Sequence, residues 1–138
     1  MKRPGKKSSP ETRPDRELLF VYGTLRRACN HRMHEVLRSH ADFIGPGKFQ
    51  GKLYDLGKFP GAVATRAISY QVQGEIYALE DAGRVFAALD AYEDQAFRRE
   101  KVAVQSENGA TILAWTYLYA RPVNRLKIIA SGDFLNRG

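Results

Sequence analysis

The sequence predicts an α+β domain whose sheet is strongly curved or closed into a barrel, flanked by two or more short helices. Three observations lead to this fold class. About six segments have the length and pattern of short strands, only two have the spacing of amphipathic helices, and glycine and proline punctuate many of the connections. No repeat or linker divides the 138 residues, so we expect one domain.

The strands are expected at residues 18–22, 48–54, 62–65, 72–79, 97–105 and 112–119. The last two are separated by Asn108-Gly109, and this dipeptide is the strongest short-range signal for a hairpin. Glycine and proline are dense between residues 45 and 61, which predicts tight turns there, one of them at residues 56–60.

Two helices are expected between these strands. Asn30 is a suitable N-cap for a helix over residues 31–39, whose apolar side chains recur at spacings of three and four. The second helix is expected to open at Glu80 or Asp81 and to run to about residue 92, with Val85 and Leu89 on its apolar stripe. Residues 128–135 are expected to dock against the domain.

The net charge of +7 is concentrated near the N-terminus. Residues 1–17 contain six basic and three acidic side chains, so they carry +3 of this charge. Because the segment is polar and contains few apolar residues, we expect residues 1–17 to be a disordered basic leader and residues 18–138 to be the domain. A basic leader could bind nucleic acid, but a solvated tail is the simpler interpretation, so nucleic acid is not expected as a partner.

Cysteine usage and hydropathy exclude several classes of protein. Cys29 is the single cysteine, so an intramolecular disulfide framework is excluded. The leader has no apolar h-region and no later segment could span a bilayer, so neither secretion nor a membrane partner is expected. These features favour a cytoplasmic protein.

The first candidate site is the turn Tyr22-Gly23-Thr24-Leu25, directly after the first strand. Glycine at a strand end permits a sharp turn and lets a ligand approach the main chain. Successive N–H groups in such a turn can bind a carboxylate. The alternative is a plain connection with Tyr22 in the core.

The second candidate is an acidic cluster at the end of the second helix, formed by Asp90, Glu93 and Asp94. The C-terminus of a helix carries partial negative charge, which together with the neighbouring acids and partial burial would raise the pKa of Glu93. A carboxylate with a raised pKa is a better proton acceptor near neutral pH. The alternative is a solvated acidic loop.

The third candidate combines Cys29, His31 and His34. These residues could nominally ligate zinc or supply a cysteine nucleophile with a histidine base. A fourth metal ligand is not apparent, and histidines on a helix surface are the simpler interpretation.

Taken in order, the segments resemble the γ-glutamylcyclotransferase-like superfamily, which includes AIG2-like and YtfP-like proteins and γ-glutamylamine cyclotransferase. The resemblance covers residues 18–135. It is carried by Leu19-Phe20-Val21-Tyr22-Gly23-Thr24-Leu25-Arg26-Arg27, Asn30-His31, Leu53-Tyr54-Asp55-Leu56-Gly57, Phe59-Pro60-Gly61-Ala62, Val72-Gln73-Gly74-Glu75-Ile76-Tyr77, Leu89-Asp90-Ala91-Tyr92-Glu93, Phe97-Arg98-Arg99-Glu100-Lys101-Val102, Ala114-Trp115-Thr116-Tyr117-Leu118-Tyr119 and Ser131-Gly132-Asp133-Phe134.

The resemblance implies a small mixed β-barrel with flanking helices and a pocket at one end. It implies that Glu93 is the catalytic acid/base and that Tyr22, Gly23, Thr24 and Leu25 bind the substrate. The implied reaction is a metal-independent cyclising acyl transfer of the lyase type. In it the α-amino group of a small γ-glutamyl amine or γ-glutamyl compound attacks the γ-carbonyl and releases 5-oxoproline and a free amine. No cofactor is expected, and we expect a monomer or a weak homodimer.

Two positions depart from the pattern of the superfamily. Asp94 replaces the usual glycine after the catalytic glutamate, and Phe97 replaces a tyrosine that often precedes the Arg-Arg pair. These departures motivate an alternative function, a non-catalytic member of the same fold that binds a small ligand.

Overall fold

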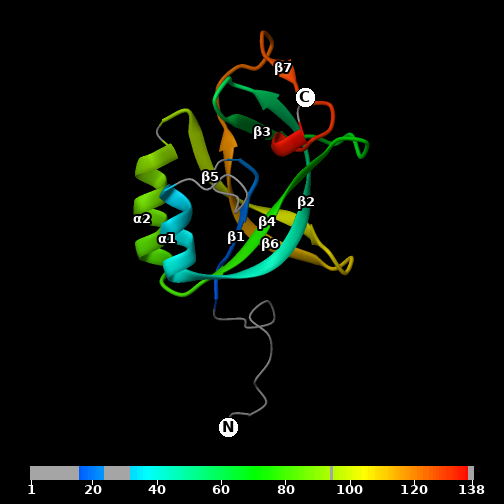
Figure 1. Cartoon of the computed structure of the whole chain (residues 1–138). Coiled ribbons are helices and arrows are strands. Elements are labelled where there is room, and N and C mark those ends of the chain that lie inside the picture. Colours follow the sequence, from blue (N-terminus) through cyan, green and yellow to red (C-terminus); the bar gives the residue numbers. More distant parts are fainter. Residues whose placement is uncertain (1–15, 24–31, 94, 137–138) are drawn as a thin grey trace.

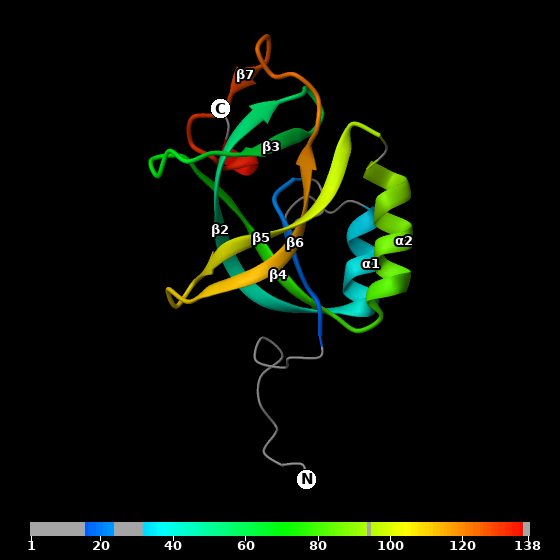
Figure 2. The same cartoon turned by 180° about the vertical axis from the view of Figure 1, so that it is seen from behind.

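Five strands close into a barrel in the computed structural model, which describes residues 16–23, 32–93 and 95–136 (Figures 1 and 2). In order around the barrel they are β2 (Ala41–Asp55), β4 (Gln71–Leu79), β1 (Leu18–Val21), β6 (Thr111–Tyr119) and β5 (Phe97–Ser106), and β5 pairs with β2 to close the ring. The β1–β6 pair is parallel and the other pairs are antiparallel. The predicted fold class, a closed mixed barrel with flanking helices, is therefore confirmed.

β2 is much longer than the sequence predicted. It pairs with β4 along most of its length, and its last residues pair with β3 (Pro60–Ala64) and β7 (Lys127–Ile128), which lie together at one end of the barrel (Figure 1). The sequence places the start of this strand at residue 48, because Gly45 and Pro46 favour a turn. A shift of register between Phe43 and Gly45 lets the strand continue through them.

Two helices, α1 (Arg32–His40) and α2 (Ala82–Glu93), lie side by side against one flank of the barrel (Figures 1 and 2). Asp81 caps α2, since its Oδ1 accepts a hydrogen bond of 3.3 Å from the backbone N–H of Arg84. Val85 and Leu89 are fully buried, as their spacing predicted. The helix ends at Glu93, which places this residue at the end of the barrel where β5 begins.

The alternation of side chains along β1 divides the apolar core in two. Phe20 points into the barrel, whereas Leu19 and Val21 point towards the helices. The interior cluster contains Phe20, Tyr22, Phe49, Leu53, Ala62, Val72, Ile76, Val104, Ala114 and Ile129. The flank cluster contains Leu19, Val21, Leu37, Tyr77, Leu79, Val85, Leu89 and Tyr117.

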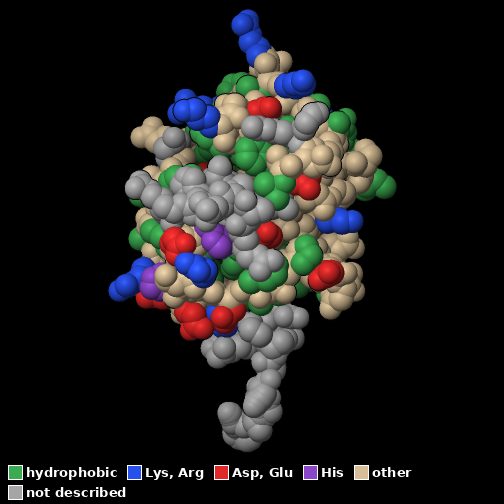
Figure 3. Space-filling model, viewed as in Figure 1, with side chains coloured by type: hydrophobic (Ala, Val, Ile, Leu, Met, Phe, Trp, Pro, Cys, Tyr) green, Lys and Arg blue, Asp and Glu red, His purple; other side chains and the backbone are tan. Residues whose placement is uncertain are grey.

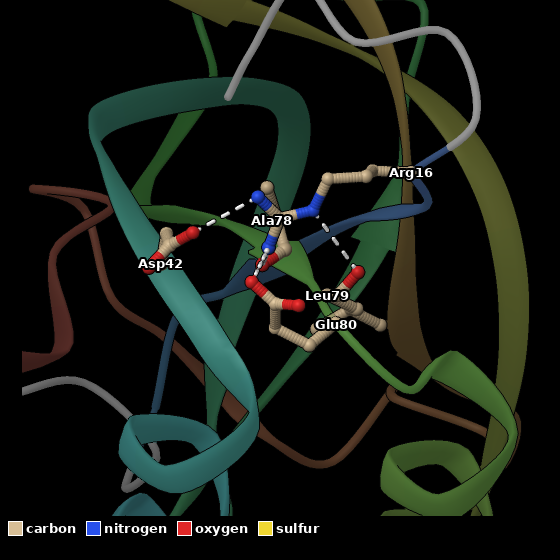
Figure 4. A network of polar contacts seen from close by, with 5 residues as sticks. All are labelled: Arg16, Asp42, Ala78, Leu79 and Glu80. Atoms are coloured by element: carbon tan, nitrogen blue, oxygen red, sulfur yellow. Dashed lines mark hydrogen bonds and ion pairs between the residues drawn. The ribbon is translucent and has the colours of Figure 1, made fainter. Parts of the chain in front are cut away.

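Arg16 ties the start of β1 to the barrel (Figure 4). Its side chain is only 6% exposed. The guanidinium donates hydrogen bonds to the carbonyl oxygens of Ala78 and Leu79 at 2.6 and 3.2 Å and to Asp42 at 2.9 Å, and it pairs with Glu80. The sequence analysis assigned Arg16 to the leader, but these contacts make it part of the domain.

The C-terminal segment docks on the barrel, as expected. The N–H of Ile129 donates to the carbonyl of Leu53, and the carbonyl of Gly132 accepts from the N–H of Gln73, each at 2.7 Å. Gly132 has φ +71°, and a Cβ there would lie 1.8 Å from the carbonyl oxygen of Gln71. Only glycine fits this contact. A 3₁₀ turn (Phe134–Asn136) follows.

Charged side chains of the described residues are dispersed over one face of the molecule (Figure 3). On the face shown in Figure 3, lysine and arginine side chains of the described residues lie apart, with acidic side chains between them. Within the described part of the chain, no helix is long and apolar enough to cross a membrane.

Candidate functional site

A cavity of about 150 Å³ lies at the end of the barrel where β1 and β6 both terminate. Because these two neighbours are parallel, their last residues meet at the same edge. The turn before β3, the end of α2 and the start of β5 complete its walls. The lining residues are Phe20, Val21, Tyr22, Gly23, Phe59, Pro60, Tyr92, Glu93, Phe97, Thr116 and Tyr117.

Tyr22 forms part of the wall and joins three strands. Its hydroxyl donates a hydrogen bond of 2.5 Å to the carbonyl of Tyr117 and accepts one of 3.1 Å from the N–H of Ala62. Burial raises the pKa of Tyr22 well above its ordinary value of 10.0, so the phenol is neutral. Tyr22 is therefore both a core residue and a cavity residue, and its hydroxyl is engaged with the backbone.

Position 23 has no room for a side chain, because its backbone passes close to Pro60. A Cβ at Gly23 would lie 2.9 and 3.0 Å from two ring carbons of Pro60, closer than carbon atoms normally pack. The absence of a side chain thus allows the end of β1 to pass beside the start of β3. Thr24 and Leu25, the other two residues of the predicted turn, lie outside the described residues, so their role in binding stays a prediction.

Glu93 lines the same cavity as Tyr22 and Gly23, although it is distant in sequence. It is half-buried at the C-terminus of α2. Burial is the main cause of the raised pKa of Tyr117, and the negative charge of Glu93 adds to it. The structure therefore brings the predicted acid and the described half of the predicted turn together. Its catalytic role and a raised pKa of its own stay predictions, and Asp94 lies outside the described residues.

A second cavity, of about 310 Å³, adjoins the first at Glu93. Its other lining residues are Asp90, Phe97, Arg99 and Tyr117. Arg99 donates to both carboxylate oxygens of Asp90, from Nε at 3.0 Å and from Nη2 at 3.2 Å. The hydroxyl of Tyr117 donates to Asp90 Oδ1 at 2.5 Å. Asp90 is part of the predicted acidic cluster, whereas its partners Arg99 and Tyr117 are not predicted as site residues.

The Asp90–Arg99–Tyr117 network is packed as well as hydrogen-bonded. The Arg99 guanidinium lies 4.0 Å from the ring centre of Phe86 and 5.0 Å from that of Trp115. Its hydrogen bonds hold the pKa of Asp90 below its ordinary value of 3.8. Burial first, and then the bond to Asp90, raise the pKa of Tyr117. Asp90 is therefore ionised and Tyr117 protonated at neutral pH.

Three aromatic side chains, Phe59, Tyr92 and Phe97, line the first cavity, and Phe97 lines the second as well. Phe59 and Tyr92 are 43% and 38% exposed. Phe97, which replaces the tyrosine of the superfamily pattern, lines both cavities and packs against Phe59 with ring centres 6.1 Å apart. This position therefore contributes an apolar surface and no hydroxyl.

His34 differs from the predicted surface histidine. It is 9% exposed, and its Nε2 lies 3.1 Å from the hydroxyl of Tyr77, which in turn donates to Glu75 Oε1 at 3.1 Å. The face of α1 that carries His34 packs inward, which the short apolar pattern did not indicate. Cys29 and His31 lie outside the described residues. In the part of the chain that the structure describes, no three His, Cys, Asp or Glu side chains form a group able to hold a metal ion.

Comparison with known proteins agrees with this architecture. The family model for AIG2-like γ-glutamyl cyclotransferases matches residues 19–136. The chain belongs to this family. Its match extends from β1 to the C-terminal 3₁₀ turn and includes both cavities.

Relatives match the family domain over nearly its whole length. The γ-glutamylcyclotransferase family protein YtfP of Escherichia coli is 36% identical over 124 residues, which covers 86% of this chain and 96% of YtfP. The solution structure of that protein superposes with a TM-score of 0.61 at 35% identity, covering 87% of this chain and 97% of the other. An AIG2-like protein from Mus musculus gives a TM-score of 0.65 at 27% identity, covering 83% of this chain and 86% of the other.

Proposed function

We propose that this family member is a γ-glutamylcyclotransferase in which Glu93 moves the protons of the reaction. The observation that carries the proposal is that Glu93 and the Tyr22-Gly23 turn line one small cavity at the end of the barrel. A carboxylate beside a backbone turn provides the two elements that the cyclisation needs, a proton carrier and a surface that fixes the glutamyl group.

The proposed reaction is intramolecular. The α-amino nitrogen of a γ-glutamyl compound attacks its own γ-carbonyl carbon, so a ring C–N bond forms and the C–N bond to the leaving amine breaks. Glu93 accepts a proton from the α-ammonium group before the attack and returns it to the leaving nitrogen. The ring nitrogen loses its second surplus proton as the tetrahedral intermediate collapses, and the released amine takes up this proton and leaves as an ammonium ion. The products are 5-oxoproline and a free amine, and the carboxylate ends the cycle as it began.

The size of the cavity fits such a reaction. A volume of about 150 Å³ holds several water-sized groups, since one water molecule requires only about 10–15 Å³ of such volume. A cavity of this size has room for the glutamyl chain in a folded conformation. Well-oriented intramolecular reactions reach effective molarities of about 10⁵ M or more, so correct folding of the substrate supplies a large part of the rate.

Turnover of a defined panel tests the proposal. The wild type would be incubated with γ-glutamyl amines and γ-glutamyl amino acids, and 5-oxoproline would be measured by mass spectrometry. Glu93→Gln is expected to lower the rate at least about 100-fold, the usual contribution of general acid–base catalysis. Glu100→Gln, an exposed glutamate on β5, is the matched control and should retain the wild-type rate. Full activity of Glu93→Gln would refute the assignment.

The second candidate is a non-catalytic protein of the same fold that binds a small γ-glutamyl compound. Phe97, which lines the cavity without the usual tyrosine hydroxyl, favours it. Binding of panel members without release of 5-oxoproline would support this function over catalysis. A cytoplasmic location and a monomeric or weakly dimeric state stay predictions.

A further inference from the structure

We infer that the hydroxyl oxygen of Tyr117 is a second acceptor for the α-ammonium group of the substrate, and that Asp90 and Arg99 hold it in position. This inference rests on the proposed function and adds a binding residue beside Glu93. It is carried by the Asp90–Arg99–Tyr117 network, which the proton transfer by Glu93 does not itself require.

The location of Tyr117 is the first argument. Tyr117, Glu93 and Phe97 are the three residues that line both cavities. The hydroxyl of Tyr117 bonds to Asp90, which lies three residues before Glu93 on the last turn of α2. Side chains three residues apart on a helix are neighbours, so the phenol oxygen lies on the side of α2 that carries Glu93.

The hydroxyl of Tyr117 has no hydrogen left to donate to a ligand. A tyrosine hydroxyl has one hydrogen to donate and lone pairs to accept. Tyr117 gives its hydrogen to Asp90 at 2.5 Å, and the directions of their pKa shifts keep that proton on the tyrosine. Towards a ligand, the phenol oxygen is therefore an acceptor only. An ammonium group, which has three N–H donors and no acceptor, is its natural partner.

The third argument concerns the direction of attack. When Glu93 removes one proton, the α-nitrogen keeps two hydrogens and gains a lone pair. A hydrogen bond from one of those N–H groups to Tyr117 would limit rotation about the Cα–N bond and so orient the lone pair towards the γ-carbonyl. The reaction depends on this orientation because nucleophile and electrophile belong to one molecule.

Asp90 and Arg99 act through Tyr117 in this account. The two oxygens of Asp90 already accept three hydrogen bonds within the network, two from Arg99 and one from Tyr117. The guanidinium of Arg99 neutralises the charge of Asp90 and is itself stacked on Phe86. Asp90 therefore fixes the phenol and is not a second base.

The network could instead serve only to join α2 to β5 and β6. A purely structural role predicts that removal of the hydroxyl weakens all ligands alike. A contact with the ammonium group predicts that only ligands carrying this group lose affinity. The two interpretations are therefore separated by comparing a γ-glutamyl ligand with its desamino analogue, the corresponding glutaryl amide.

The first measurement is turnover by Tyr117→Phe, using a substrate that the wild type converts to 5-oxoproline. A hydrogen bond to a charged group is expected to be worth about ten- to a hundredfold in kcat/KM. Tyr119→Phe loses a hydroxyl two residues further along the same strand and is the matched control, expected to equal the wild type. Thermal melting of each variant verifies that the measured protein is folded.

The second measurement is ligand affinity by calorimetry in the Glu93→Gln background, where the substrate is expected to be consumed at least about 100-fold more slowly. Adding Tyr117→Phe should weaken the γ-glutamyl ligand about tenfold or more and leave the glutaryl amide unchanged. Equal losses for both ligands, or no loss for either, would overturn the inference. If Tyr117→Phe does not fold, Asp90→Ala releases the phenol from its position, and Asp90 is 46% exposed. The same selectivity is then expected, with a smaller loss of about two- to tenfold.

The two proposals fail in different ways. Wild-type protein that releases no 5-oxoproline from any panel member overturns the proposed function and this inference with it. Wild-type turnover that Glu93→Gln abolishes and Tyr117→Phe leaves intact overturns the inference alone.

Discussion

Tyr117 and Tyr77 are two buried tyrosines whose hydroxyls each bond polar side chains, and of this pair Tyr117 alone borders the cavities. Tyr117 bonds Asp90 beside Arg99 at the end of the barrel, while Tyr77 bonds His34 and Glu75 beneath α1. Both tyrosines are nearly inaccessible to solvent. Tyr117 lines both cavities next to Glu93, whereas Tyr77 and its partners line neither.

The difference between the two networks shows how a candidate site can be distinguished from polar groups that are hydrogen-bonded within the core. The hydroxyl hydrogen of Tyr77 is donated to Glu75, so its bond to His34 requires that Nε2 carry the hydrogen and donate. Each of these three buried side chains therefore has a protein partner within the network, which is how buried polar groups are accommodated. Titratable residues in a core therefore indicate function only where they face open volume, as they do beside Glu93.

Among the substitutions that test this difference, Tyr77→Phe is expected to have the largest effect on the free energy of unfolding. Tyr77→Phe removes the partner of His34 and of Glu75, both of them buried, and each lost bond to a buried group costs about 1–3 kcal/mol. We expect the free energy of unfolding to fall by about 2–4 kcal/mol, measured by urea denaturation. Activity per folded molecule should be unchanged.

Tyr117→Phe is the matched variant for this prediction, since both substitutions remove one phenolic hydroxyl. If Tyr77→Phe lowers kcat/KM as strongly as Tyr117→Phe under conditions where both are folded, the functional distinction between the two networks is wrong.

The next largest effect on stability is expected at two glycines, Gly23 beside the cavity and Gly83 in α2. Alanine should lower the free energy of unfolding at Gly23 and raise it at Gly83. Gly23→Ala places a methyl group against Pro60 at the cavity, so overpacking should cost about 1–3 kcal/mol and weaken ligand binding. Gly83→Ala in α2 meets no atom within 4 Å and should stabilise the protein by up to about 1 kcal/mol. Denaturation curves for the two variants verify the signs. A neutral Gly23→Ala would mean that Pro60 moves freely and that the cavity wall is not fixed.

The smallest effect concerns pH. The pKa of Asp90 is lowered in the folded state by its bonds to Arg99, so its stabilising contribution is present above pH 3.8 and is lost as pH falls through the folded value. The carboxylate is 46% exposed, which limits this contribution to below about 1 kcal/mol. The stability difference between wild type and Asp90→Asn should therefore narrow as pH falls from 5 towards 2. A difference that stays constant would contradict the ion pair.

Local sequence signals predicted much of the architecture. The apolar run of β1, the Asn108-Gly109 hairpin and the capped helix α2 all depend on neighbouring residues, and each lies where expected. Glu93 was assigned through the family resemblance, and its place at the end of α2 follows from the helical pattern.

The features that sequence reasoning missed depend on long-range register. Arg99 and Tyr117 face each other because β5 and β6 pair with that register, and neither residue is close in sequence to helix-borne Asp90. Arg16 belongs to the domain because its guanidinium reaches two carbonyls of β4, which a polar, charged segment does not reveal. Both the Asp90–Arg99–Tyr117 network and the contacts of Arg16 therefore become visible only in the folded structure.

The most direct measurement is a titration of ¹⁵N-labelled protein with 5-oxoproline, followed by amide chemical shifts. The account predicts that the largest changes occur at Gly23, Glu93 and Tyr117, with His34 and Tyr77 unaffected. Shifts concentrated around His34 and Tyr77, or no change at Gly23 and Glu93 with saturating ligand, would contradict the assignment of the cavity as the binding site.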